Sequence, residues 1–248
     1  MAEPTLSLTL ADLRERVSNF LGTGRTYSSL SSGDAANVDD SIDSGLRRFY
    51  SEHDWRFLRP VTSITCVVGT WQYDLPDDFG SMTGPMTFDP NYVARPISMV
   101  GESMIRVKRQ SFDTSGVPRY GAIRYKSSTQ GAGQDQELLL WPTPDVAYVL
   151  RYAYTVLPDN LVATTKEYPY GGRQHGQTIL EACLAAAEAV PNGQMGLHET
   201  LYQQALARSR RIDAQGAAES LGANCDRSDD PDAVDRIARV TYNGVLYP

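Results

Sequence analysis

The chain has 248 residues, 41% hydrophobic and 21% charged, so it can build a core and lacks the composition of a disordered chain. Its 30 acidic and 23 basic residues give a net charge of -7, which disfavours a surface that binds nucleic-acid phosphates tightly. Cys66, Cys183 and Cys225 lie far apart and predict no disulfide framework. We expect neither classical secretion nor insertion into a membrane, and we expect assembly in a reducing cytoplasm.

Residues 1–58 predict two amphipathic helices. Apolar residues recur at helical spacing from Leu10 to Leu21, with Thr9 placed to cap the helix and Gly22 placed to end it. A second periodic run follows Asp34 and ends near Trp55. Each helix has one apolar face that needs a partner.

Residues 59–158 predict a small antiparallel β unit. The segments 61–68 and 71–75 alternate around Gly69-Thr70, which predicts a hairpin. Further strands are expected at 97–100, 105–108, 120–126, 137–141 and 147–156, the last two joined by a proline-bearing turn. The final strand places five residues on one face: Tyr148, Leu150, Tyr152, Tyr154 and Val156.

Residues 159–215 predict two more helices. An alanine-rich stripe runs from Ile179 to Val190, Pro191-Asn-Gly193 breaks it, and apolar residues resume at helical period from Leu197 to Ile212. Because the first and last helices would each expose an apolar stripe alone, we expect an α+β fold. In it, an antiparallel helical bundle from both ends of the chain carries the β unit as an inserted sandwich or barrel.

Residues 216–248 predict an extended carboxyl-terminal arm. Gly222 to Asp232 is polar and acidic, and no helical or strand period continues there. The end, 240–248, is strand-like with no obvious partner within the chain.

No catalytic or metal constellation is visible in the sequence, and we expect no cofactor. His53, His175 and His198 do not share a metal-ligand spacing with one another or with a cysteine. Cys183 with His175 as its base is conceivable, but Cys183 lies inside the alanine-rich stripe, where a buried inert thiol is favoured. Three acidic pairs, at 39–40, 77–78 and 229–230, fit helix starts, turns and solvated linkers.

Four segments carry a resemblance to a known family. Phe49–Leu58, followed by an alternating strand and Trp71–Phe79, resembles tailed-bacteriophage head-to-tail adaptors of the tail tubular protein A and gatekeeper type. The segments 139–145 and 150–154 resemble that family's second hairpin. The residues of these motifs that we expect in the core are Trp55, Phe57, Leu58, Tyr73, Leu75, Pro76, Phe79, Trp141 and Pro142.

The resemblance implies a structural virion protein of the neck or tail and not an enzyme. Its partners would be other copies in a twelve-subunit ring, the portal protein, a tail nozzle or tail tube protein, and genomic dsDNA that passes without specific binding. Subunit packing is expected at Ala182, Ala186 and Ala187, whose small side chains let helices approach closely. Docking on the portal or a neighbouring subunit is expected from Val240, Tyr242, Val245, Leu246 and Tyr247.

Three other functions remain open on the sequence. Another neck or tail component, such as a nozzle or stopper, would differ only in its position. A DNA-binding module would use the basic cluster at 106–109 or 208–211, against the acidic net charge. A tail-associated hydrolase would need a paired-carboxylate or Cys/His site, which the sequence does not display.

Overall fold

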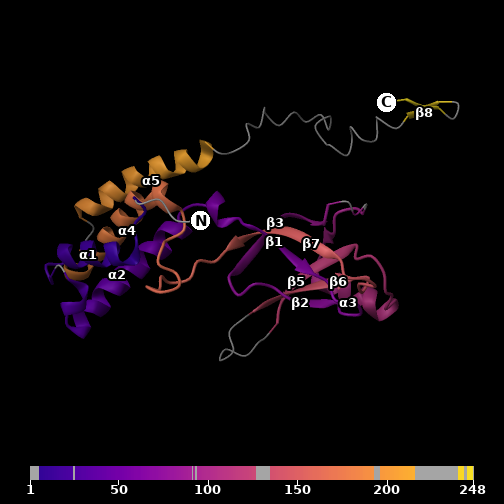
Figure 1. Ribbon diagram of the computed structural model, residues 1–248, viewed down its shortest axis with the longest axis horizontal. Coiled ribbons are helices and arrows are strands. Elements are labelled where there is room, and N and C mark those ends of the chain that lie inside the picture. The colour runs from indigo at the N-terminus through magenta and orange to yellow at the C-terminus, as the bar shows by residue number, and fades with distance from the viewer. Residues whose placement is uncertain are drawn as a thin grey trace. The chain divides into compact units, whose positions relative to one another are not determined.

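The computed structural model describes residues 6–24, 26–90, 92, 94–126, 135–192, 196–215, 240–242 and 245–247. Within these residues the chain is mixed α+β, with five α-helices, two sheets of mainly antiparallel strands and a separate pair of strands (Figure 1). Residues 1–213 form one compact unit and residues 214–248 a second.

Four helices from the two ends of the first unit share one hydrophobic cluster: α1 (Leu10–Phe20), α2 (Ser32–Ser51), α4 (Gly172–Asn192) and α5 (Leu197–Gln215). The predicted cap of α1 is confirmed, because the Asp12 amide donates to Thr9 Oγ1 at 3.1 Å and the Thr9 amide donates to Asp12 Oδ2 at 2.9 Å. Helix α2 begins slightly earlier than predicted, with Ser31 as its cap.

Helices α2 and α4 approach closely at Gly45 of α2. A Cβ built there would lie 2.6 Å from the Cα and the amide nitrogen of Cys183 in α4. Cys183, Ala182 and Ala187 of α4 are all 0% exposed in the shared cluster. Small residues on both helices therefore bring the two backbones into contact.

The β unit is made of two sheets. Sheet A has the strand order β1 (Val61–Thr65), β7 (Val149–Val156), β3 (Phe79–Phe88). Sheet B has the order β2 (Gln72–Asp74), β6 (Gln136–Trp141), β5 (Tyr120–Tyr125), β4 (Ser98–Met99), and only its β4–β5 pair is parallel among the described strands.

Side chains of both sheets meet in a second hydrophobic cluster. Leu138 and Leu140 of β6 join it from sheet B, and the five residues predicted on one face of β7 join it from sheet A. Those five residues are between 0% and 7% exposed, so this prediction is confirmed.

Both predicted hairpins are wrong. Strand β1 pairs with β7 and β2 pairs with β6, so 61–65 and 72–74 lie in different sheets. The same holds for β6 and β7, which are consecutive in sequence but belong to sheets B and A. Alternation shows which face of a strand is buried, but it does not specify the neighbouring strand.

Two elements of the β unit differ from the prediction. The expected strand at 105–108 is part of α3 (Glu102–Ser111), in which Ile105 is fully buried and Arg106 lies 3.7 Å from Glu102 one turn earlier. A short apolar run fits either structure, and here the helical period wins. Strand β3 was not predicted, because Gly80, Gly84 and Pro85 suggest a loop; its register shifts occur in this region.

The second unit contains β8 (Val240–Tyr242) and β9 (Val245–Tyr247), which pair antiparallel with each other. The expectation of a strand-like end without a partner in the chain is therefore wrong, because the end folds back on itself. The predicted arm between Gln215 and Val240 lies outside the described residues.

Replacing Gly45 with alanine is expected to lower the free energy of unfolding by about 1–3 kcal/mol, because the new methyl group overlaps the backbone of α4. The matched control is Gly33→Ala in the first turn of the same helix, where the nearest atom to a new Cβ is Ser31 Oγ at 4.0 Å. That variant should be neutral or more stable, by up to about 1 kcal/mol. Urea unfolding measures both, and equal effects would contradict the close approach.

Candidate functional site

The Trp-x-Phe-Leu step, Trp55–Leu58, lies at the turn between α2 and sheet A; Trp55 and Leu58 are buried, whereas Phe57, also expected in the core, is half-buried. Trp55 is 1% exposed and donates from Nε1 to the Phe49 carbonyl at 2.9 Å. Its ring lies 4.5 Å from that of Phe49 and 5.3 Å from that of Phe57, between centroids. Leu58, in the short 3-10 helix η2 (Arg56–Leu58), is 4% exposed. The step thus ends α2 and directs the chain into β1.

The last turn of α5 fixes the same turn from the other side. Asp213 Oδ1 accepts from the Arg56 amide at 3.2 Å, and its Oδ2 lies 3.3 Å from His53 Nε2. Arg210 donates to the Glu52 carbonyl at 2.7 Å. Sequence reasoning missed this contact, because the two segments are far apart in the chain and carry no shared motif.

The Tyr-x-Leu-Pro-x-Asp-Phe motif, Tyr73–Phe79, carries the chain from sheet B to sheet A. The Tyr73 hydroxyl donates to the Thr70 carbonyl at 2.7 Å and accepts from the Val67 amide at 3.1 Å, and burial raises its pKa to about 12. Beyond the turn, Asp78 Oδ1 accepts from the Tyr154 hydroxyl at 3.0 Å, and the Phe79 ring stacks on that of Tyr154 at 5.5 Å. Of the other motif residues, Leu75 is 5% exposed and Pro76 is half-buried.

The Trp-Pro-Thr-Pro segment makes a second crossing between the sheets. The Trp141–Pro142 peptide is cis, and Trp141 donates from Nε1 to the Phe112 carbonyl at 3.1 Å. Thr143 is buried, and its hydroxyl accepts from Arg109 at 2.9 Å. The motif residues therefore connect elements of the scaffold and do not gather into a reacting centre.

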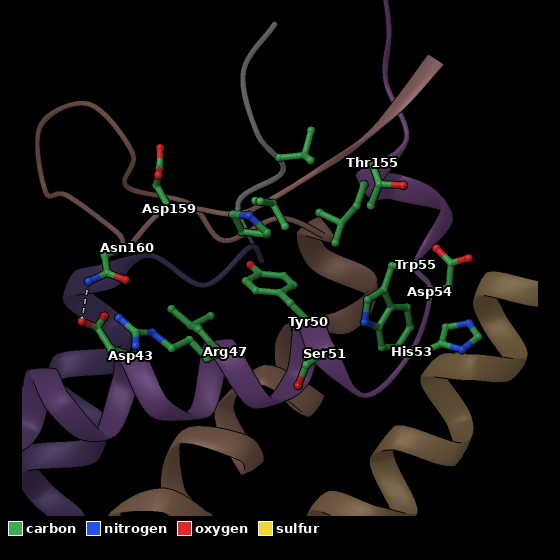
Figure 2. A pocket seen from close by; sticks show the side chains of 15 residues that line it. Asp43, Arg47, Tyr50, Ser51, His53, Asp54, Trp55, Thr155, Asp159 and Asn160 are labelled. Carbon is green, nitrogen blue, oxygen red and sulfur yellow. Dashed lines mark hydrogen bonds between the residues drawn. The ribbon is translucent and has the colours of Figure 1, made fainter. Parts of the chain in front are cut away.

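One cleft lies between α2 and the segment that follows β7. It has a volume of about 290 Å³, which is at the lower limit of pockets that hold small molecules. Figure 2 shows Tyr50 in its middle, the Asp43–Asn160 pair towards one end, and Trp55 with Thr155 towards the other. Asn160 donates to Asp43 Oδ2 at 2.8 Å.

The carboxylates of this cleft already have partners. Burial raises the pKa of Asp43, while Arg47 in the same lining lowers it. Asp54 is paired with Arg59 and Asp159 with Lys166. A cleft with a largely apolar lining and compensated carboxylates suits a short apolar protein segment better than a metal ion or a phosphate. No cluster of His, Cys, Asp or Glu that could hold a metal ion occurs among the described residues.

Helix α3 buries Ile105, turns Lys108 and Arg109 towards aromatic rings, and leaves Met104 and Val107 exposed. Arg109 lies 4.0 Å from the centroid of the Trp71 ring, and Lys108 lies 4.7 Å from that of Trp141. Met104 and Val107 are 42% and 59% exposed on the outer side. The basic cluster 106–109, considered as a DNA patch, therefore has two of its three cations engaged with aromatic rings.

Cys183 and His175, considered as a nucleophile and its base, lie in different surroundings. Cys183 is 0% exposed, its thiol donates towards the Ile42 carbonyl at 3.7 Å, and burial raises its pKa to about 12. His175 lies among the rings of Phe49, Trp55 and Phe57. A thiol that stays protonated at neutral pH is not a nucleophile.

The residues expected to pack subunits together divide into two kinds. Ala182 and Ala187 are 0% exposed within the subunit's own core, while Ala186 is half-buried. Those expected to dock on a partner lie in β8 and β9: Val240, Tyr242, Val245, Leu246 and Tyr247. Subunit packing and docking by these residues stay predictions. None of the described helices is long and apolar enough to span a membrane.

The motif residues hold the connections between α2, sheet A and sheet B, as expected for a structural subunit. The sequence profile of the SU10 adaptor protein family matches residues 8–224. The chain therefore belongs to this family of phage head-to-tail adaptors, and the resemblance in its motifs is confirmed. The family is one of structural phage proteins, so the chain is a virion component that associates with other head or tail proteins. A comparison with curated proteins gives no match.

His175 is expected to make the fold sensitive to acid. It is 3% exposed, burial lowers the pKa of its imidazole below 6.5, and its Nδ1 has no hydrogen-bond partner among the described residues. The unfolded chain then takes up this proton at a higher pH than the folded chain, so stability falls as the pH drops below about 6.5. In His175→Phe the free energy of unfolding should fall less between pH 7 and pH 5. Equal slopes in urea unfolding would contradict this account.

Proposed function

We propose that the chain forms a homo-oligomeric ring of twelve subunits that joins the portal of the head to the tail. The ring attaches below the portal and presents its other side to the tail nozzle or tail tube protein. The observation that carries the proposal is the match to the adaptor family over residues 8–224. Many weak contacts repeated around two coaxial rings add up to a strong attachment.

The DNA channel follows from the ring and from the charge. With 30 acidic and 23 basic residues, the subunit carries a net charge of -7. A negative wall repels phosphate, so genomic dsDNA slides through without specific binding. Two of the three cations at 106–109 contact aromatic rings, which also weighs against a dedicated DNA-binding module.

The helical part carries the subunit contacts in this proposal. The four helices act as an antiparallel bundle, and the inserted β unit, a small sandwich or barrel, faces outward or tailward. The protonated, buried Cys183 thiol weighs against a hydrolase with a Cys/His site. A stopper or nozzle is the alternative, and it would share the fold but occupy another level of the neck.

Electron microscopy of purified particles tests the assignment. A subunit carrying a small tag at residue 1 should appear as one ring directly below the portal. Density for the tag below a second ring would assign the chain to the stopper or nozzle, and its absence from the neck would refute the proposal.

In this proposal the subunit assembles into the virion in the cytoplasm of the host bacterium.

Substitutions at two adjacent alanines separate subunit packing from folding. Ala187→Leu enlarges a residue that is 0% exposed, so we expect it to destabilise the subunit by about 1–3 kcal/mol. Ala186 is half-buried, and Ala186→Leu should leave the free energy of unfolding nearly unchanged while it prevents assembly. Urea unfolding and sedimentation velocity measure the two effects. A ring that forms normally with Ala186→Leu would place the subunit contact elsewhere.

Deleting Val240–Pro248 should leave a folded subunit that no longer joins the portal. Because residues 1–213 form a compact unit of their own, its free energy of unfolding should change by less than about 0.5 kcal/mol. Binding to purified portal rings, measured by co-sedimentation, should be lost or strongly weakened. A truncated chain that binds the portal as well as the full chain would show that the end is not a tether.

A further inference from the structure

The edges of the two sheets are not equally protected against pairing with another strand. Strand β3 has Pro85 and two register shifts, β4 has only two residues, and β2 has three residues with Asp74 bound to Lys126 at 2.8 Å. Strand β1 has five residues, Val-Thr-Ser-Ile-Thr, with neither proline nor charge. Natural sheets usually protect an exposed edge with such features, so β1 is an edge open to pairing.

The free side of β1 offers a regular set of main-chain groups. Pro60 accepts from the Tyr154 amide at 3.2 Å, and the Cys66 amide donates to the Tyr148 carbonyl at 2.7 Å. Antiparallel pairing alternates, so Thr62 and Ile64 also face β7, whereas the N–H and C=O groups of 61, 63 and 65 point away from it. Among the described strands β7 is the only partner of β1.

The β8–β9 hairpin would be stabilised by pairing with a further strand. An isolated two-stranded hairpin is at best marginally stable in water, and a third strand stabilises it. Each of its strands has three residues, which fit within the five-residue length of β1, and their types, Val-Thr-Tyr and Val-Leu-Tyr, favour strands. The 24 residues from 216 to 239 can span up to ~80 Å when extended. The hairpin can therefore reach another subunit.

We propose that the β8–β9 hairpin of one copy pairs through one of its strands with β1 of the next copy and extends sheet A. The occupant of the β1 edge is thus a second copy of this chain. Donor and acceptor are different surfaces of the same subunit, so the contact is heterologous and repeats from copy to copy until a ring closes. This inference rests on the proposed ring and names its strand contact.

Two variants each remove one half of the contact. Ser63→Pro removes an amide that points away from β7, so the pairing of β1 with β7 keeps its hydrogen bonds. The matched control, Ser63→Ala, keeps that amide. Deletion of Val240–Pro248 removes the donor and leaves β1 intact. Circular dichroism and urea unfolding show that each variant is folded.

Sedimentation velocity of the full-length chain and the variants measures the contact. Ser63→Pro and the deletion should each raise the concentration needed for assembly by about tenfold or more, and Ser63→Ala should not. A mixture of Ser63→Pro with the deletion variant should form a one-to-one dimer, because one supplies the hairpin and the other supplies β1. Neither variant should form that dimer alone.

Three results would overturn the inference: no dimer in the mixture while the wild-type chain assembles, normal assembly of Ser63→Pro, or normal assembly of the deletion variant. If Ser63→Pro does not fold, residue-level hydrogen exchange in the wild-type chain decides. At least one of the amides of 61, 63 and 65 should exchange more slowly on assembly, and unchanged exchange of all three would refute the pairing. Wild-type binding to portal rings, measured in parallel, tests the proposed function separately, because it can persist when the strand contact fails.

Discussion

The first unit depends on the buried turn that ends α2. The Trp55 indole donates to the Phe49 carbonyl, so a helix end that would leave a carbonyl unpaired in an apolar core is satisfied by the side chain that follows it. Asp213 of α5 fixes the same turn from the carboxyl-terminal helices. One turn thereby links both ends of the helical part to the first strand of sheet A.

Other polar groups of the fold make contacts of the same kind. Arg48 holds Glu199 through two hydrogen bonds of 2.6 Å and lies over the Tyr202 ring, and Tyr73 pins the loop that precedes its own strand. Such groups position main chain and helices. A protein whose polar side chains are committed in this way is suited to bind other proteins through its outer faces, as a head-to-tail adaptor does.

The sequence was sufficient for features set by local periodicity and motifs. It predicted the four long helices, the cap at Thr9, the buried face of β7 and the adaptor family. It failed for contacts between segments that are far apart in the sequence. Strand β1 pairs with β7, which lies almost the whole β unit away. The contact of Asp213 with the turn after α2 joins segments that share no sequence pattern. The short run around Ile105 fits a strand or a helix equally well, and its packing on sheet B settles which forms.

The pairing of β1 with β7 also sets an order in time. Val61 pairs with Ala153, so sheet A cannot close while the chain is being synthesised until its last strand has left the ribosome. The helical core forms later still, because α2 packs on α4, which is synthesised after β7. A chain that ends before β7 therefore lacks both sheet A and the helical core. Such chains are kept out of assembly by their own topology, before any contact with another subunit is tested.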